Sequence, residues 1–435
     1  MAGGYNEIVR VRLARFLLWF AGFGLLWVPV LDDPPLATAS YVQDVTSSSA
    51  VIAIVMAAPT QVEGTLWIGD SAVATVRGPE GRRRHALHFE GLEAGKRYRY
   101  SLTQVGGEEI GSGSVTTAST DDRAPVRFVF LGDSGDQPWW VWLQTSPLFH
   151  LPARWHWLPC SQAVSRVGAA VAAWSPDLVL HLGDVIYPKG LNAHYSSGFF
   201  RPFEAVMRDV PVYAVLGNHD VMDCDGVQFA SNLRLPPSEA TGDGRMFSLA
   251  RGPVRIIGLD CNTDRTGWRY DTQHPAHAFL SAELANATEP WIVVASHFPM
   301  RSWSRQGNRA ELLLGMLPEL ERQGVSLYLS GHDHCYQRFG EPGAGEPVLV
   351  VSGGGGKDLY DIKPKQAGPA PAAAAKAYHW GCAEVVGGDL HVVANGLDGI
   401  RIDAFDLPLP SGDSLARIRA VSPARAARIE ALGKR

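Results

Sequence analysis

Two histidines separated by a single residue, His332 and His334, follow an apolar run and a glycine in the segment YLSGHDHCYQR. Side chains two residues apart on an extended segment point to the same side. Both imidazoles are therefore expected to reach one place. An isolated His-x-His pair is weak evidence for a metal site, so the interpretation depends on the other chemically active residues of the chain.

Further apolar runs of strand length recur after residue 125, and several end in groups that bind metal ions. The endings are GDSGD, GDVIY, GNHD, ASHFP and SGHDH. They supply these side chains: Asp133, Asp184, Tyr187, Asn218, His219, Asp220, His297, His332 and His334. Carboxylates and a phenol mixed with imidazoles suit iron, zinc or manganese better than calcium or copper. Such a set suffices for two ions that share a carboxylate, and ion pairs about 3.5–4 Å apart are typical of phosphate-ester hydrolases.

The elements that must position these groups read as a layered α/β domain. Near-continuous Val, Ile and Leu runs are typical of strands buried on both faces, and helical patterns such as SQAVSRVGAAVAAW lie between some of them. The pattern predicts an α/β (α+β) fold with mixed sheets flanked by helices. Loops at the carboxyl ends of strands carry ligands in such sheets, so the polar endings are expected to converge on one site.

Five blocks in fixed order carry a family resemblance. GDSG (132–135), GDVIY (183–187), GNHD (217–220), VASH (294–297) and GHDH (331–334) resemble the purple acid phosphatases, which are calcineurin-like metallophosphoesterases. The resemblance implies a metallophosphoesterase catalytic domain over residues 125–408. From GNHD to the glycine loop VVSGGGG, the chain is most similar to the tartrate-resistant type. We interpret that glycine loop as a close approach to the metals.

The resemblance also implies a ligand set, in which His332 and His334 hold different ions. For Fe(III), the implied ligands are Asp133, Asp184, Tyr187 and His334. For a divalent iron, zinc or manganese ion, they are Asp184, Asn218, His297 and His332. Many two-metal phosphoesterases have a histidine two residues after the first aspartate, but Gly135 stands there in this chain. Tyr187 is placed to fill that vacancy, and a phenolate favours Fe(III) because a trivalent ion lowers its pKa.

The expected activity is hydrolysis of phosphate monoesters, of the acid phosphatase type, in which a metal-bound hydroxide attacks phosphorus. His219 would assist the leaving group or steady the phosphoryl oxygens, and Asp220 would orient His219. The alternatives are a phosphodiesterase or phospholipase-type hydrolase on the same metals, and a surface binding module without catalysis. The complete ligand set argues against the binding module.

Residues 36–120 carry a different pattern, with many short strand-like runs separated by Gly, Pro, Ser and Asp. This spacing predicts a small antiparallel β-sandwich. The segment GLEAGKRYRY, with Leu92 six residues before Tyr98, resembles a tyrosine corner. We therefore expect a fibronectin-type-III-like domain, which fits the N-terminal domain of the larger purple acid phosphatases.

The chain ends suggest export and a C-terminal tail. Arg10, Arg12 and Arg15 precede the apolar run FLLWFAGFGLLWV, and Ala37-Thr38-Ala39 follows it. Residues 1–35 are expected to be a signal peptide that directs the protein to the periplasm or outside the cell. An uncleaved membrane anchor at residues 16–31 is the alternative. Residues 409–435 are expected to be a tail, in which a helix is one possibility.

The net charge of the chain and one tryptophan-rich insertion indicate which binding partners to expect. The 435-residue chain has a net charge of −5, and the lack of a basic surplus predicts no nucleic-acid-binding surface. The expected partner is a small phosphate ester. Residues 137–159 contain five tryptophans and look like an insertion after the first metal loop. The segment is interpreted as a self-packed loop, as a lid that selects an apolar leaving group, or as a membrane contact.

Overall fold

The computed structural model describes residues 36–121, 123–135, 162–223, 225–236, 244–262, 270–365, 368–386 and 388–434. Two expected features lie outside this part of the chain: the signal peptide or anchor in residues 1–35, and the tryptophan-rich segment 137–159. A search of the described residues finds no helix with both the length and the apolar character needed to cross a membrane.

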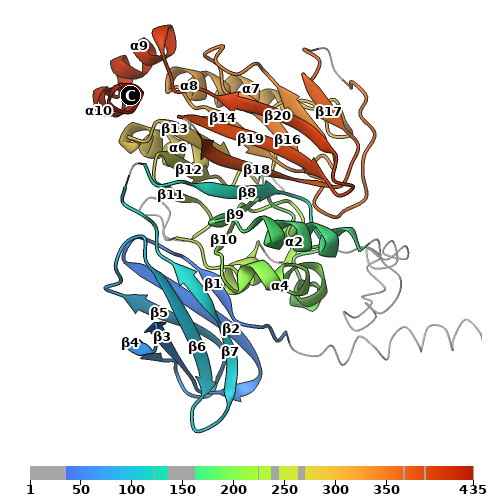
Figure 1. Cartoon of the computed structure of the whole chain (residues 1–435). Coiled ribbons are helices and arrows are strands. Elements are labelled where there is room, and N and C mark those ends of the chain that lie inside the picture. The colour runs from blue at the N-terminus through green and yellow to red at the C-terminus, as the bar shows by residue number, and fades with distance from the viewer. Residues whose placement is uncertain are drawn as a thin grey trace, which may run out of the picture.

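The N-terminal domain consists of two antiparallel sheets that enclose a small core (Figure 1). The first sheet has the order β1 (Tyr41–Gln43), β2 (Ser49–Thr60), β5 (Arg82–Glu90). The second has the order β4 (Ser71–Arg77), β3 (Val62–Ile68), β6 (Arg97–Gln104), β7 (Glu109–Thr116). The Tyr98 hydroxyl accepts a hydrogen bond from the backbone N–H of Glu93 at 2.9 Å. The narrower assignment as a fibronectin-type-III-like domain stays a prediction.

The larger domain, which follows residue 125, contains two mixed sheets, as the sequence predicts. The six-stranded sheet has the order β10 (Val212–Ala214), β9 (Leu178–His181), β8 (Arg127–Leu131), β18 (His379–Val386), β19 (Asp389–Gly396), β20 (Arg401–Leu407). The seven-stranded sheet has the order β11 (Phe247–Arg251), β12 (Val254–Gly258), β13 (Trp291–Ala295), β14 (Leu327–Ser330), β16 (Val348–Ser352), β15 (Tyr336–Phe339), β17 (Ala373–Ala375). Strands β8, β9 and β10 run parallel to one another, and so do β12, β13, β14 and β16.

Helices cover the outer face of each sheet, so the larger domain has four layers (Figure 1). Beside the six-stranded sheet lie α2 (Ala163–Trp174), α3 (Asn192–Tyr195), a π-helical turn (Ser196–Phe200) and α4 (Arg201–Met207). Near the seven-stranded sheet lie α6 (Pro275–Asn286), α7 (Ala310–Gly315) and α8 (Leu317–Arg322). A 3₁₀ turn (Asp220–Asp223) and α5 (Val227–Asn232) complete this region.

Alternate residues of the buried strands serve two hydrophobic cores. In β13, Val293 and Ala295 face the core between the sheets, whereas Ile292 and Val294 face the helices α6 to α8. This alternation follows from the two-residue period of a strand. It explains why the sequence shows continuous apolar runs at these strands, because both faces of each strand are covered.

The C-terminal segment 409–435, expected as a tail, is an integral part of the fold. It forms α9 (Gly412–Val421) and α10 (Pro423–Gly433). Arg425 is only 2% exposed, and its guanidinium donates to the backbone carbonyls of Glu289, Pro290, Gln323 and Gly324. These bonds anchor α10 on the loops that precede β13 and β14.

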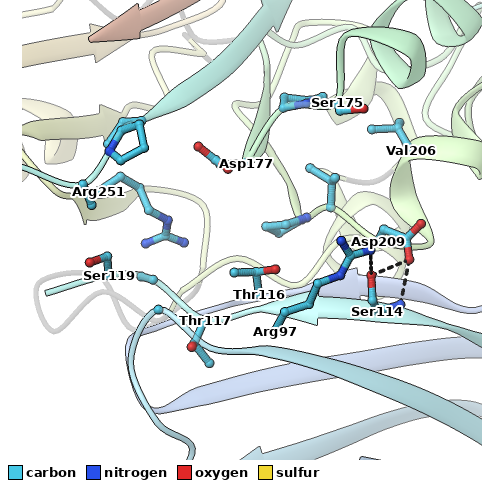
Figure 2. A pocket seen from close by; sticks show the side chains of 18 of the residues that line it. Arg97, Ser114, Thr116, Thr117, Ser119, Ser175, Asp177, Val206, Asp209 and Arg251 are labelled. Atoms are coloured by element: carbon cyan, nitrogen blue, oxygen red, sulfur yellow. Dashed lines mark hydrogen bonds between the residues drawn. The ribbon is translucent and has the colours of Figure 1, made fainter. Parts of the chain in front are cut away.

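The two domains meet along β6, β7 and the loop after α4. The Tyr100 hydroxyl donates to the Arg208 carbonyl at 2.8 Å, and Asp209 accepts from the backbone N–H of Ser114. A cavity of about 520 Å³ lies at this boundary, and the side chains of Asp177 and Arg251 line it (Figure 2). None of the residues that line this cavity belongs to the metal-binding set expected from the sequence.

Candidate metal centre

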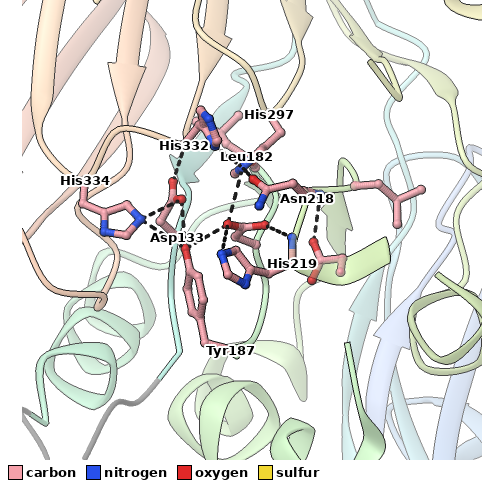
Figure 3. Close-up of polar contacts among 12 residues, drawn as sticks. Asp133, Leu182, Tyr187, Asn218, His219, His297, His332 and His334 are labelled. Atoms are coloured by element: carbon pink, nitrogen blue, oxygen red, sulfur yellow. Dashed lines mark hydrogen bonds and ion pairs between the residues drawn. The ribbon is translucent and has the colours of Figure 1, made fainter. Parts of the chain in front are cut away.

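The expected metal-binding residues gather where parallel strands of both sheets end. In the six-stranded sheet, Asp133 follows β8, Asp184 and Tyr187 follow β9, and Asn218 and His219 follow β10. In the seven-stranded sheet, His297 follows β13, and His332 and His334 follow β14. Figure 3 shows these labelled side chains directed toward one another: Asp133, Tyr187, Asn218, His219, His297, His332 and His334. The convergence expected from the strand endings is therefore observed.

One half of the cluster centres on the phenol of Tyr187. Its Oη lies 3.0 Å from Asp133 Oδ1 and 3.0 Å from Asp184 Oδ2. The same Oη lies 3.3 Å from His334 Nε2, which in turn lies 3.4 Å from Asp133 Oδ1. These four side chains are at most 4% exposed. They form a compact set of two carboxylates, a phenol and an imidazole.

The other half centres on the imidazole of His297. Its Nε2 lies 3.2 Å from Asn218 Oδ1 and 3.2 Å from His332 Nδ1. The same Nε2 lies 3.5 Å from Asp184 Oδ2. This carboxylate oxygen is also the one closest to Tyr187. Asp184 is therefore common to both halves of the cluster.

Backbone carbonyls orient two of the ligand rings. His297 Nδ1 lies 2.8 Å from the Leu182 carbonyl, and His334 Nδ1 lies 2.6 Å from the Asp358 carbonyl. A carbonyl can only accept, so the Nδ1 of each ring carries the proton. The Nε2 of each ring then faces the cluster, and in the neutral ring it would offer a lone pair to a metal ion, as metal-binding histidines do.

The backbone adopts unusual conformations at three of these residues. Asp133, Asp184 and His332 have φ values of 56°, 51° and 68°, which non-glycine residues rarely adopt. Such conformations often occur at functional sites. His332 therefore does not lie on an extended segment, as the sequence had suggested, but in the bend that follows β14. Gly217 packs so closely on Asp184 that any Cβ would collide with the Asp184 backbone nitrogen.

The charges of the cluster favour a bound cation. Burial raises the pKa of Asp184, but attraction to His297 and His219 outweighs burial and holds this pKa below its usual value. Burial and the two neighbouring carboxylates raise the pKa of Tyr187 far above its usual value. Ligand atoms of Asp133, Asp184 and His297 lie within 4.8 Å of one another. Buried carboxylates at this spacing require positive charge, and metal ions would supply it.

His219 occupies a different environment from the buried ligands. Its side chain is 30% exposed, its Nε2 lies 4.0 Å from Asp184 Oδ2, and its ring packs 4.6 Å from that of Tyr187. Its Nδ1 lies 2.7 Å from the Pro188 carbonyl. The ring is therefore held in place while its Nε2 faces the cluster.

The expected role of Asp220 needs correction. Its carboxylate accepts hydrogen bonds from the backbone N–H of Gly217 at 2.9 Å and of Val185 at 3.0 Å. The Pro188 carbonyl, rather than Asp220, orients the His219 ring. Asp220 instead ties together the two loops that carry Asp184 and His219. Burial and repulsion from Asp184 raise the pKa of Asp220.

Sequence reasoning missed two neighbours of the cluster, both in the loop after β16. Tyr360 stacks on His334 with ring centroids 4.0 Å apart, and Lys357 Nζ lies 4.5 Å from the centroid of the Tyr187 ring. The only signal in the sequence was the glycine run before Lys357. The structure places this run against the metal-binding loops, because Gly355 N–H donates to the Gly132 carbonyl at 3.0 Å.

Comparison with known proteins agrees with this geometry. Residues 126–336 match the family model of calcineurin-like phosphoesterases. Purple acid phosphatase 17 of Arabidopsis thaliana is 28% identical over 215 residues, 44% of this chain and 63% of that protein. The chain thus matches less than two thirds of this relative. Tartrate-resistant acid phosphatase type 5 of Mus musculus is 26% identical over 298 residues, 63% of this chain and 85% of that protein.

A solved structure shows the same fold. Purple acid phosphatase PPD1 from yellow lupin (Lupinus luteus) seeds matches with a TM-score of 0.67 and 15% identity, over 86% of this chain and 74% of that one. The resemblance inferred from the five sequence blocks is thus confirmed. Residues 126–336 form a calcineurin-like phosphoesterase domain, and the chain is a homologue of the purple and tartrate-resistant acid phosphatases, which are metallophosphoesterase hydrolases.

Proposed function

We propose that this protein is a binuclear metal-dependent hydrolase of phosphate monoesters, of the acid phosphatase type. One observation carries the proposal: Asp184 Oδ2 lies 3.0 Å from Tyr187 Oη and 3.5 Å from His297 Nε2. A single carboxylate therefore belongs to two donor sets of different chemistry. The set with the phenol suits Fe(III), and the set with the amide and two imidazoles suits a divalent iron, zinc or manganese ion.

The donor geometry fits the ligand assignment expected from the sequence. The residues that would hold Fe(III) are Asp133, Asp184, Tyr187 and His334. Those that would hold the divalent ion are Asp184, Asn218, His297 and His332. When bound, the two ions would polarise the phosphoryl oxygens and acidify a water molecule. No nucleophilic serine or cysteine is needed for this chemistry.

His219 would supply the proton for the leaving group. Its Nδ1–H donates to the Pro188 carbonyl at 2.7 Å, which fixes the ring. Its Nε2 then faces the cluster and can carry a proton toward an ester oxygen. The partial exposure of this ring supports the role, because a leaving group must depart toward solvent.

The substrate and the location are also proposals. A small phosphate monoester is the proposed substrate, and the absence of a basic surplus in the sequence supports a partner other than nucleic acid. The arginines before the apolar run at residues 16–28 support export through a signal peptide in residues 1–35. An anchor at residues 16–31, or a membrane contact through the tryptophan-rich segment 137–159, remains an alternative to free release.

A matched pair of substrates tests the activity. The purified, metal-saturated chain is assayed with p-nitrophenyl phosphate and with bis(p-nitrophenyl) phosphate at acidic and neutral pH. We expect kcat/KM for the monoester to exceed that for the diester by about tenfold or more. Asp184→Asn should abolish turnover, whereas Asp398→Asn, at an exposed turn, should not change it.

The opposite preference would overturn the monoester assignment in favour of a phosphodiesterase or phospholipase-type enzyme. A chain that binds two metal ions and hydrolyses neither substrate would support the non-catalytic binding module.

A further inference from the structure

Lys357 reaches the metal centre from the loop after β16. Its backbone N–H donates to the Asp133 carbonyl at 3.0 Å, which fixes the start of the side chain beside a ligand residue. The preceding glycines allow this approach, since a Cβ at Gly353 would lie 2.8 Å from Asp133 Oδ2. The side chain then places its ammonium 4.5 Å from the centroid of the Tyr187 ring.

The ammonium of Lys357 has N–H donors available for a ligand. The side chain is partly buried; burial lowers its pKa to about 8, and the carboxylates of Asp358, Asp184 and Asp133 oppose this shift. Among the residues that the structure describes, none makes a hydrogen bond or ion pair with Nζ. A ring face satisfies part of its charge but uses none of its three N–H donors.

Metal binding would change this balance. Asp133 and Asp184 would then share their negative charge with the ions, so the attraction that they exert on Lys357 would weaken. A phosphate dianion between the ions and the ammonium would restore the compensation, through charge-assisted hydrogen bonds.

The position of Lys357 relative to His219 points to the same occupant. His219 packs 4.6 Å from the Tyr187 ring, and Lys357 Nζ lies 4.5 Å from the same ring. The proposed proton donor and this cation therefore both pack against one phenol, whose oxygen belongs to the metal-binding cluster. A phosphoryl group bound beside that oxygen would therefore lie near both side chains.

From this geometry we infer that the Lys357 ammonium donates hydrogen bonds to a non-bridging oxygen of the phosphoryl group, both in the substrate and in the phosphate product. This inference rests on the proposed phosphatase function and assigns one more substrate-binding residue to the same site. The competing interpretation is that Lys357 only supports the Tyr187 ring.

Inorganic phosphate separates these two interpretations. Its binding to the metal-loaded full chain is measured by calorimetry and as competitive inhibition of monoester hydrolysis. We expect Lys357→Met to weaken phosphate binding roughly tenfold to a hundredfold and to raise KM, with metal content unchanged. Lys357→Arg should recover part of the loss. Lys363→Met is the matched control, because it removes a 79% exposed lysine that pairs with Asp361, and it should leave phosphate binding unchanged.

Two outcomes would overturn the inference: unchanged phosphate binding in Lys357→Met, or loss of bound metal in that variant, which would show a supporting role. Calorimetry does not require turnover. A wild-type chain that binds phosphate through Lys357 but hydrolyses no ester would therefore refute the proposed function and leave the binding role of Lys357 intact.

Discussion

His332 and His334 direct their imidazoles into different halves of one cluster, although a single residue separates them. His332 Nδ1 lies 3.2 Å from His297 Nε2, whereas His334 Nε2 lies 3.3 Å from Tyr187 Oη. The positive φ of His332, 68°, turns the chain between the two rings. Each histidine should therefore serve a different metal ion.

Alanine substitutions at the two histidines should have separable effects. His334→Ala should remove a ligand from the half that contains the phenol, and so should lose iron and any visible absorption that depends on it. His332→Ala should lose the divalent ion and keep that absorption. Metal analysis and absorption spectra of both variants check this expectation. Loss of the same ion from both variants would contradict it.

Tyr187→Phe tests the iron assignment. The phenyl ring keeps the packing against His219, but the oxygen that lies 3.0 Å from two carboxylates is removed. If Fe(III) binds this phenolate, the wild-type protein should be purple or pink and the variant should lose or shift the absorption band. A colourless wild-type protein with two bound ions would remove the iron assignment and retain a two-metal hydrolase.

His219→Gln tests the proton donor. Loss of general acid catalysis typically costs 10²- to 10⁴-fold in rate, so kcat for an alkyl phosphate should fall by about that factor. The loss should be smaller for p-nitrophenyl phosphate, because p-nitrophenolate leaves without protonation. Metal content should not change, since His219 lies outside the proposed ligand set. Equal losses for the two substrates would argue for a role in binding the phosphoryl group instead.

The sequence predicted which side chains gather at the candidate site, because strand ends carry strong local signals. A buried strand, a glycine and a polar residue recur at Asp133, Asp184 and Asn218, and parallel strands bring such endings to one edge. The layered sheets followed from the continuous apolar runs. The likeness to known phosphoesterases added the order of the blocks, and the fold comparison agrees with it.

Contacts that depend on the exact path of a loop were not predictable in this way. Nothing in the sequence indicates that the Pro188 carbonyl, and not Asp220, contacts the His219 ring. Every residue has a backbone carbonyl, so residue identity does not show which carbonyl makes a contact. Lys357 was missed because it lies 23 residues beyond His334 and reaches Tyr187 only through the pairing of β16 with β14. The docking of α10 through Arg425 is likewise a long-range contact.

The buried His379 predicts how stability depends on pH. This residue is 0% exposed; its Nδ1 lies 2.9 Å from the Ala377 carbonyl and its Nε2 lies 3.0 Å from Ser352 Oγ. The carbonyl requires a proton on Nδ1, so the neutral ring accepts from the serine hydroxyl through Nε2. Burial lowers the pKa of His379 from 6.5 to about 4, although the Ala377 carbonyl and Asp133 oppose this shift.

The sign of the effect follows from proton linkage. Below pH 6.5 the unfolded chain protonates this histidine, whereas the folded chain keeps it neutral until about pH 4. The unfolded state thus binds more protons in this interval. As the pH is lowered from 6.5 to about 4, this residue should therefore reduce the free energy of unfolding by up to about 1.4 kcal/mol per pH unit. His379→Gln removes the titrating group and keeps a side chain that can bond to Ser352. Urea unfolding of wild type and variant across this interval should show a shallower pH slope in the variant. Identical slopes would mean that the folded protein already protonates His379 near its ordinary pKa.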